Sequence, residues 1–445
     1  MLSRKLYLVN CLGFVLLLLL FPCLCGIVHA QRVVIDITKP SFERIPIAVP
    51  DFKYLTPDQT QLAREMGEAL ASDLDYSGIF RPLDPRGFLE DPQSMGVTDR
   101  DIKFPDWRKL GAEFLVRCAY TIQGSSLKLE ARLFDVVGTR MVLGKVYEVE
   151  ARNWRAVVHR FADEILMALT GDRGVFDTKI AFVQVQGKIK EIYVSDFDGS
   201  NPVAVTRDQG LNLSPAWSSD GAQLAYVSFK EGNAKIYVAN VTDGSQRLLC
   251  GYPGINIAPA WKPGSRELAV TLSKGGNPDI YLVSSTGEVI QRLVQSWAIN
   301  VSPSWSPEGR RLAYVSNETG NPQIYILDLS TGQKRRISFS GSYSTSPSWS
   351  PKGDWIAYNA VVGGHHNIMM VRPDGGDVRQ MTHGEGDNES PTWSPDGRMI
   401  AFSSTRQGGS PAIWVLLTNG TGTRRLTHLG GGQELPDWSP RLSGR

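Results

Sequence analysis

The segment SPSWSPEGRRLAYVS, residues 302–316, recurs almost unchanged as SPSWSPKGDWIAYNA at 346–360 and as SPTWSPDGRMIAFSS at 390–404. Looser copies read SPAWSSDGAQLAYVS from residue 214, APAWKPGSRELAVTL from 258 and a truncated LPDWSP from 435. One tryptophan marks each copy: Trp217, Trp261, Trp305, Trp349, Trp393 and Trp438, which by subtraction lie 44, 44, 44, 44 and 45 residues apart. A fixed period of this length is typical of solenoids, propellers and arrays.

Each 44-residue unit contains four short apolar segments separated by turn residues. In the copy from residue 302 the segments are SPSWS, RLAYVS, QIYILDL and KRRIS. Pro307 and Gly309 between the first two suit a tight hairpin, because proline presets its φ and glycine tolerates a positive φ. Four short antiparallel strands repeated radially predict a blade of a β-propeller. Third-strand positions recur at the same spacing, and we therefore expect six blades: Tyr193, Tyr237, Tyr281, Tyr325, Met369 and Trp414.

The two ends of the repeat region are out of phase. The region begins with KIAFVQ, residues 179–184, which matches a second strand and has no tryptophan strand before it. It ends with LPDWSP, a tryptophan strand with no second strand after it. The sequence therefore predicts that the C-terminus supplies the missing strand of the first blade, which removes the unpaired sheet edges of an open ring.

The residues around each ProXTrp motif suggest two different roles. A tryptophan at one equivalent position in every blade is expected to fill the space between adjacent sheets. The segments just before the motif read GLNLS, GINIA, AINVS, SYSTS, GDNES and GGQEL, and they are polar and vary from blade to blade. Because equivalent positions in a ring share a face, we expect these segments to form a recognition surface at one mouth of the central channel.

The first thirty residues predict a secretory signal. Arg4 and Lys5 precede a short apolar run, and a small-residue exit leads to predicted cleavage after Ala30; the alternatives are a retained anchor or a lipidated cysteine at Cys23 or Cys25. Removing residues 1–30 takes away two of the 47 basic residues and leaves 45 basic and 45 acidic residues. The mature chain then has no net positive charge that would attract nucleic acid. The two remaining cysteines, Cys118 and Cys250, are expected to be buried thiols in different domains.

Residues 31–172 contain no copy of the 44-residue repeat. They predict a compact α+β domain, followed by the propeller at 173–445. RVVIDIT and IPIAVPDF are expected as strands, and three alternating segments at 112–122, 127–136 and 141–150 as an antiparallel meander. Helices are expected from Pro57, at DWRKL and from an N-capping Asn153 to Gly171.

Together, the signal, the IAVPDF strand, the DLDYSGIFRPLD segment and six WSPDG, LAYVS and IYV units ending in PDWSP resemble the TolB family of the Tol-Pal envelope system of Gram-negative bacteria. The resemblance implies a periplasmic, monomeric binding protein without catalytic, cofactor or metal residues, which links TolA to the peptidoglycan-associated lipoprotein Pal. Through Pal it would be peripheral to the outer membrane and would support outer-membrane integrity and constriction in cell division. The TolA contact would map to Gln31, Arg32, Val33, Val34, Ile35, Asp36 and Ile37. The Pal contact would map to the mouth, at Ile255, Asn256, Ala258, Asn300, Val301, Ser302, Tyr343 and Asn388.

The alternative is a secreted propeller hydrolase with a metal or peptidase site at the channel mouth. No GlyXSerXGly nucleophile motif is present, and the residues outside the signal and the ring are too few for a hydrolase domain. Asp387 and Glu389 are the candidate carboxylates for a metal site. His365 and His366 are expected in a loop between the second and third strands, as solvated residues that make a poor chelating pair.

Overall fold

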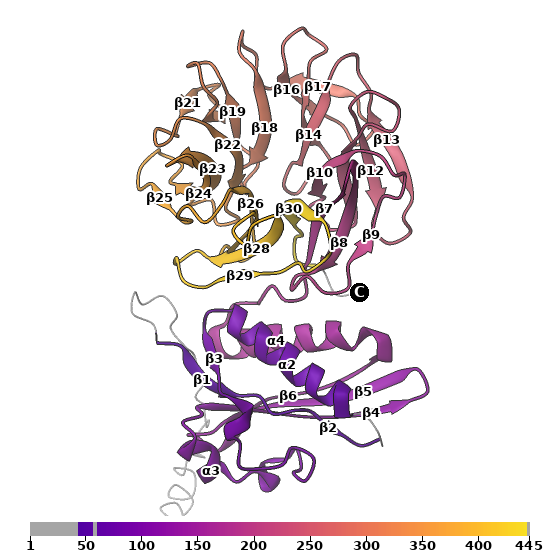
Figure 1. Cartoon of the computed structure of the whole chain (residues 1–445), viewed down its shortest axis with the longest axis vertical. Helices are drawn as coiled ribbons and strands as arrows, with labels where there is room; N and C mark the ends of the chain where they lie inside the picture. Colours follow the sequence, from indigo (N-terminus) through magenta and orange to yellow (C-terminus); the bar gives the residue numbers. More distant parts are fainter. Residues whose placement is uncertain (1–42, 57–59, 443–445) are drawn as a thin grey trace, which may run out of the picture.

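The computed structural model describes residues 43–56 and 60–442, which form a mixed α/β domain and a propeller that pack against each other (Figure 1). The RVVIDIT segment and the predicted signal lie outside the described residues. Within the described ranges, no helix has the length and apolar character needed to cross a bilayer.

The N-terminal domain is built on one mixed sheet in the order β3-β1-β4-β5-β6, with β2 paired to β4. Its strands are β1 (Ile45–Ala48), β2 (Lys53–Tyr54), β3 (Phe80–Pro82), β4 (Phe114–Gln123), β5 (Ser126–Asp135) and β6 (Arg140–Glu150). The antiparallel meander β4-β5-β6 is the one predicted from the sequence. The parallel pairing of β1 with β3 and β4 was not predicted.

Two helices lie between this sheet and the propeller, α2 (Thr60–Tyr76) and α4 (Trp154–Thr170) (Figure 1). Helix α2 buries Ala63, Met66, Leu70 and Leu74, at the spacing of one helical face. Gly171 ends α4 in the left-handed region, as expected. Asn153 precedes α4, but its side chain makes no capping hydrogen bond, so that part of the prediction is wrong.

The other face of the sheet is covered by α3 (Phe104–Lys109), which buries Trp107 against β4 and β5. Short 3₁₀ turns occur at Pro85–Gly87, Asp99–Asp101 and Ala151–Asn153. The cores on the two faces of the sheet are separate clusters, and the α2/α4 cluster continues into the propeller through residues such as Met399 and Val415.

The propeller contains six four-stranded antiparallel sheets. From the innermost strand to the outermost, blade 1 is β30 (Gly432–Trp438), β7 (Lys179–Gln186), β8 (Ile189–Asp196) and β9 (Val203–Ala204); blade 2 is β10 (Asn212–Trp217), β11 (Gln223–Ser228), β12 (Lys235–Asn240) and β13 (Gln246–Cys250); blade 3 is β14 (Asn256–Trp261), β15 (Leu268–Leu272), β16 (Asp279–Val283) and β17 (Val289–Arg292); blade 4 is β18 (Asn300–Trp305), β19 (Arg311–Ser316), β20 (Gln323–Asp328) and β21 (Lys334–Arg336); blade 5 is β22 (Ser344–Trp349), β23 (Ile356–Val362), β24 (His365–Val371) and β25 (Arg379–Gln380); blade 6 is β26 (Asn388–Trp393), β27 (Met399–Ser404), β28 (Ala412–Leu417) and β29 (Thr423–Arg425). The C-terminal β30 pairs with β7 from Gly432↔Val185 to Trp438↔Ile180, which confirms the predicted ring closure.

The six repeat tryptophans lie between blades, as predicted. Each is at most 9 % exposed. Trp261 donates its indole N–H to the carbonyl of Ala216 in the preceding blade at 3.1 Å, and Trp393 donates to Ser348 at 2.9 Å. Trp217, Trp261, Trp305 and Trp393 therefore join neighbouring sheets by a hydrogen bond as well as by packing.

The two faces of the ring are distinct. We call the face where the inner strands begin the mouth, and the face where they end at their tryptophans the turn face. The N-terminal domain lies beside blades 6 and 1 (Figure 1), and its core is continuous with residues of these blades. Arg398 of a blade 6 turn donates to Asp172 at 2.6 Å, and Arg424 forms an ion pair with Asp75 of α2.

The predicted domain boundary between residues 172 and 173 stays a prediction. In the structure, α4 ends at Thr170 and the first propeller strand, β7, begins at Lys179.

Candidate partner-binding site

The central channel is a cavity of about 370 Å³ lined by the inner strands of all six blades. Each inner strand has an irregular register at its centre, for example between Val301 and Ser304. The residue before each proline adopts a left-handed conformation with φ of 51–55°: Ser214, Ala258, Ser302, Ser346, Ser390 and Leu435. Proline is tolerated at the next position, because this bulged part of the strand borders the channel and needs no N–H for a hydrogen bond to a neighbouring strand.

The channel contains one carboxyl group at the X position of ProXTrp, that of Asp437. Equivalent positions are Ala216, Ala260, Ser304, Ser348 and Thr392. Asp437 accepts the backbone N–H of Trp217 at 2.7 Å, so it joins blade 1 to blade 2. Burial inside the ring raises the pKa of Asp437 to about 7, although the residue retains partial exposure toward the channel. A single carboxyl at one blade does not make a convergent metal site.

Three of the residues predicted to contact Pal are buried amides. Asn256, Asn300 and Asn388 are at most 1 % exposed. Asn300 Nδ2 donates to Asp279 Oδ1 at 2.8 Å, Ser296 Oγ at 2.8 Å and the Ala298 carbonyl at 3.1 Å. These amides fix the loop that enters each inner strand, so the expectation that they crowd an exposed rim is wrong for their side chains.

In blades 4 and 5 the residue just before the inner strand faces outward, and there the mouth is apolar. Ile299 is 48 % exposed and Tyr343, at the equivalent position of the next blade, is 45 % exposed. Trp297 and Phe339 in the same two loops are 71 % and 65 % exposed. The sequence segments looked polar because their polar residues are the buried ones. The Phe339 ring lies beside Gly375 in the β24–β25 turn, away from the mouth, so we call Trp297, Ile299 and Tyr343 the apolar rim.

The remaining predicted Pal residues occupy intermediate positions. Ile255 and Val301 are partly exposed at the mouth, and Ala258 and Ser302 line the channel. The structure thus brings the predicted residues to one end of the ring, and only Tyr343 among them is well exposed. Whether they contact a partner stays a prediction. The residues predicted for TolA, 31–37, lie outside the described residues.

The histidine pair and the two candidate carboxylates are close together in blade 5 and its neighbour. His365 and His366 begin strand β24, so the prediction that they lie in a loop is wrong. His365 Nδ1 is 3.7 Å from Asp387 Oδ1, and His366 Nε2 is 3.6 Å from Glu389 Oε1. Each ring therefore faces its own carboxylate, and the four groups do not converge on one point.

Sequence reasoning missed a buried cluster at the junction of the two domains. His159 Nδ1 of α4 lies 2.7 Å from Asp73 Oδ2 of α2, and both side chains are at most 2 % exposed. Within the described ranges, His159, Asp196 and Asp198 form the one group with metal-like spacing. Burial raises the pKa of Asp73 to about 6, while the neighbouring carboxylates raise the pKa of His159.

This cluster already has a full set of ionic partners. Asp196 forms an ion pair with Lys179, and Asp198 Oδ2 lies 3.2 Å from Arg155 Nη1. When His159 is protonated, it supplies together with Lys179 and Arg155 three positive charges beside the three carboxylates of Asp73, Asp196 and Asp198. The spacing of these residues in the sequence, 86 positions between Asp73 and His159, gave no signal of the pair.

Comparison with known proteins gives matches to both domains. A family model described as the TolB beta propeller domain matches residues 166–442, and one described as the TolB amino-terminal domain matches residues 33–142. A Tol-Pal system protein TolB from Desulfosudis oleivorans is 43 % identical over 219 residues, and one from Syntrophus aciditrophicus is 40 % identical over 229 residues. The alignments cover 49 % of this chain, and the chain spans about half the length of these curated relatives, 50 % and 51 %.

A solved structure supports the same two-domain arrangement. The crystal structure of TolB from Acinetobacter baumannii is similar to this chain with a TM-score of 0.78 and 26 % sequence identity. The superposition covers 89 % of this chain and 97 % of that chain.

Proposed function

Because this chain belongs to the TolB family, a non-enzymatic component of the Tol-Pal system, we propose that it is a periplasmic adaptor that links TolA to the lipoprotein Pal. Its N-terminal residues 31–37 engage TolA, and the propeller mouth holds Pal. Through this link the protein supports outer-membrane integrity and constriction of the envelope in cell division. The hydrolase alternative is set aside, because the family is non-enzymatic.

The apolar rim is the observation that supports a partner at the mouth. Large apolar side chains that remain mostly exposed, clustered on two adjacent loops, are typical of an interaction surface. Trp297 and Tyr343 belong to the residue types that are enriched among interface hot spots. The Asn300 amide holds the loop of Trp297 and Ile299 through hydrogen bonds to Asp279, Ser296 and Ala298, which lowers the entropic cost of ordering this loop when a partner binds.

The test compares two isoleucines of similar exposure. Ile299 in the rim is 48 % exposed, and Ile290 in β17, outside the rim, is 52 % exposed. We expect Ile299→Ala to weaken Pal binding about tenfold, the effect of losing one hot-spot side chain, and Ile290→Ala to leave it unchanged in calorimetry. Equal affinities for the two variants would contradict the placement of Pal at the rim.

The TolA half of the proposal has a separate test. Deleting residues 31–37 is expected to abolish capture of TolA while Pal affinity stays the same. Loss of both activities together, with a lowered melting temperature, would mean that the segment is structural.

A further inference from the structure

A second surface feature lies on the turn face, away from the N-terminal domain. It is a groove of about 920 Å³ between blades 2 and 3. Its walls are the β10–β11 turn, strand β13, the β14–β15 turn and the β16–β17 turn, and Trp261 lies at its base. We call it the blade 2/3 groove.

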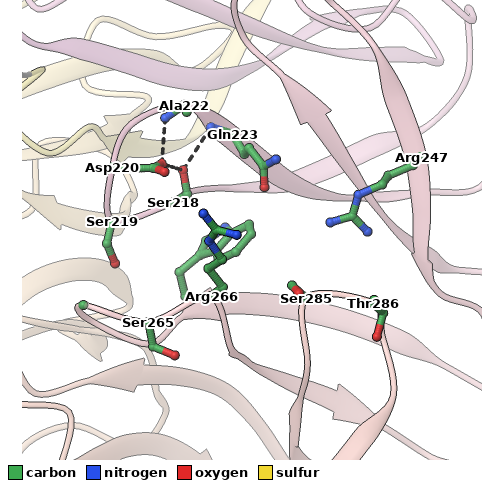
Figure 2. Close-up of a pocket in the computed structure, with 12 residues that line it drawn as sticks. Ser218, Ser219, Asp220, Ala222, Gln223, Arg247, Ser265, Arg266, Ser285 and Thr286 are labelled. Atoms are coloured by element: carbon green, nitrogen blue, oxygen red, sulfur yellow. Dashed lines mark hydrogen bonds between the residues drawn. The ribbon is translucent and has the colours of Figure 1, made fainter.

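Two arginines enter the groove from the two blades. Figure 2 shows Arg247 of blade 2 and Arg266 of blade 3 extending into the space, with Ser285 and Thr286 across from them. Among the described residues, neither guanidinium forms a hydrogen bond or an ion pair. The groove therefore presents two guanidinium groups without hydrogen bonds beside side-chain hydroxyl groups. The Asp220 carboxylate shares the groove, and hydrogen bonds from Ser218 and Ala222, together with the charge of Arg266, lower its pKa.

The acidic residues near these arginines have other partners. Asp220 accepts hydrogen bonds from Ser218 Oγ at 2.6 Å and from the backbone N–H of Ala222 at 3.0 Å, which form the β10–β11 turn (Figure 2). Glu267 forms an ion pair with Lys262 at 2.9 Å. The groove has no free carboxylate that the arginines could take without breaking one of these contacts.

The propeller repeat shows what arginines at these positions bind elsewhere. Arg247 pairs with Val238 in the sheet of blade 2, and Arg424 pairs with Val415 at the equivalent register of blade 6. Arg424 binds the carboxylate of Asp75 in the N-terminal domain. At the same register of blade 5, Arg379 binds Asp377 at 2.8 Å, whereas Arg335 in blade 4 donates to the backbone carbonyls of Pro373 and Asp374 in the next blade. Two of these three arginines thus bind a carboxylate.

The second arginine position follows the same rule. Arg266 lies five residues after Trp261, and Arg398 lies five residues after Trp393. Arg398 binds the carboxylate of Asp172 at 2.6 Å. On blade 6, then, the two equivalent positions both hold carboxylates that the N-terminal domain supplies. The blade 2/3 groove carries one of these positions from each of its two blades, where that domain does not reach.

We propose that the blade 2/3 groove is a docking site for an acidic peptide segment of a partner protein, whose carboxylates pair with Arg247 and Arg266. Two guanidinium groups from different blades suit a ligand with two separated acidic groups, and a groove of about 920 Å³ is too large for one small anion alone. The paired Asp75 and Asp172 show that carboxylates of a folded chain fit these positions. The serine and threonine hydroxyls offer further hydrogen bonds to the peptide backbone.

The experiment measures binding of a defined probe to the full chain. The probe is a fluorescein-labelled peptide, Gly-Asp-Ser-Asp-Gly-Asp-Ser, followed by fluorescence anisotropy at about 20 mM salt, where screening of exposed charges is weak. A matched peptide carries asparagine in place of aspartate. Inorganic phosphate as a competitor and phosphatidylglycerol vesicles in a sedimentation assay test whether phosphate groups are the preferred source of negative charge.

The key variant is Arg247→Gln with Arg266→Gln. We expect it to bind the aspartate peptide about tenfold more weakly, because two charge-assisted pairs of modest strength are lost. The matched control is Arg207→Gln with Arg64→Gln, which removes the same charge from exposed positions outside the groove and should change affinity by less than about twofold. Melting temperatures of both variants should equal that of the wild type, since none of these four guanidinium groups forms a hydrogen bond or an ion pair among the described residues.

Three results would overturn the proposal. The first is equal weakening by the two double variants, which would show only the effect of net charge. The second is equal binding of the aspartate and asparagine peptides. The third is binding of phosphate or vesicles that depends on Arg247 and Arg266 without any binding of the peptide. Pal affinity should be unchanged in the Arg247/Arg266 variant, so this test is independent of the proposed role of the mouth.

Discussion

Trp349 and Trp393 allow the interblade hydrogen bond to be separated from interblade packing. They occupy equivalent positions, and both are 6 % exposed. Trp393 donates its indole N–H to the Ser348 carbonyl at 2.9 Å, whereas the buried Trp349 Nε1 has no acceptor among the described residues. Replacing either by phenylalanine removes the same atoms and leaves a similar cavity, so the cavity cost should cancel in the comparison.

The difference between the two variants should come from the N–H group. Trp393→Phe loses a hydrogen bond worth about 0.5–1.5 kcal/mol, while Trp349→Phe removes a buried unpaired donor that costs the wild type about 1–3 kcal/mol. We therefore expect Trp393→Phe to be less stable than Trp349→Phe by about 1.5–4.5 kcal/mol. For a domain of this size the difference corresponds to a gap on the order of 5–10 °C in melting temperature.

The assay is urea unfolding followed by tryptophan fluorescence and circular dichroism, with calorimetric melting as a second measurement. Trp305→Phe serves as a control, because Trp305 donates to the Ala260 carbonyl at 3.1 Å and should behave like Trp393. If Trp349→Phe is as destabilising as the other two, the hydrogen bonds contribute nothing measurable. The tryptophans would then act through packing alone.

Three further predictions follow from the ring. Asn300→Arg should lower the melting temperature, because it places a charge at a fully hydrogen-bonded buried site, whereas His365→Arg, half exposed, should melt like the wild type. Because its pKa is raised to about 7, Asp437 in the folded protein holds a proton from about pH 4 to 7, whereas in the unfolded chain it does not. Its contribution to the free energy of unfolding is complete below about pH 4 and is lost as the pH rises through about 7. Asp437→Asn should abolish this pH dependence of the urea midpoint. Deleting residues 435–445 should cost at least the about 3–5 kcal/mol typical of losing a buried aromatic; unchanged melting would contradict the ring closure.

The architecture of the ring was predictable because it depends on repeated local signals. The tryptophan period, the hairpin turn residues and the phase difference between Lys179 and Trp438 sufficed to predict six blades and their closure. The meander β4-β5-β6 was predictable for the same reason, since each strand alternates and the turns are short. Parallel pairing of β1 with β3 and β4 joins segments far apart in the chain, and no local pattern encodes it.

The candidate site was predictable in position and not in side-chain detail. The repeat locates the mouth, but polarity alone suggested that residues such as Asn300 face the partner. An asparagine that donates to two or three loop acceptors satisfies its amide better inside the protein than in water, and this depends on loop geometry that the sequence does not show. The outward position of Ile299 and Tyr343 follows from the same geometry.

The pairing of β30 with β7 also dictates when the propeller can finish folding. Val185 is synthesised 247 residues, by subtraction, before its partner Gly432. Until the final strand emerges, β7 has an unpaired edge and the space for Trp438 beside Thr178 is unfilled. The entropic cost of closing so long a loop grows only slowly with its length, but such distant contacts form late and slow the folding rate. A nascent or truncated chain would therefore expose one reactive strand edge, a suitable target for a chaperone or a protease, and completion of the last blade would remove that target in a single step.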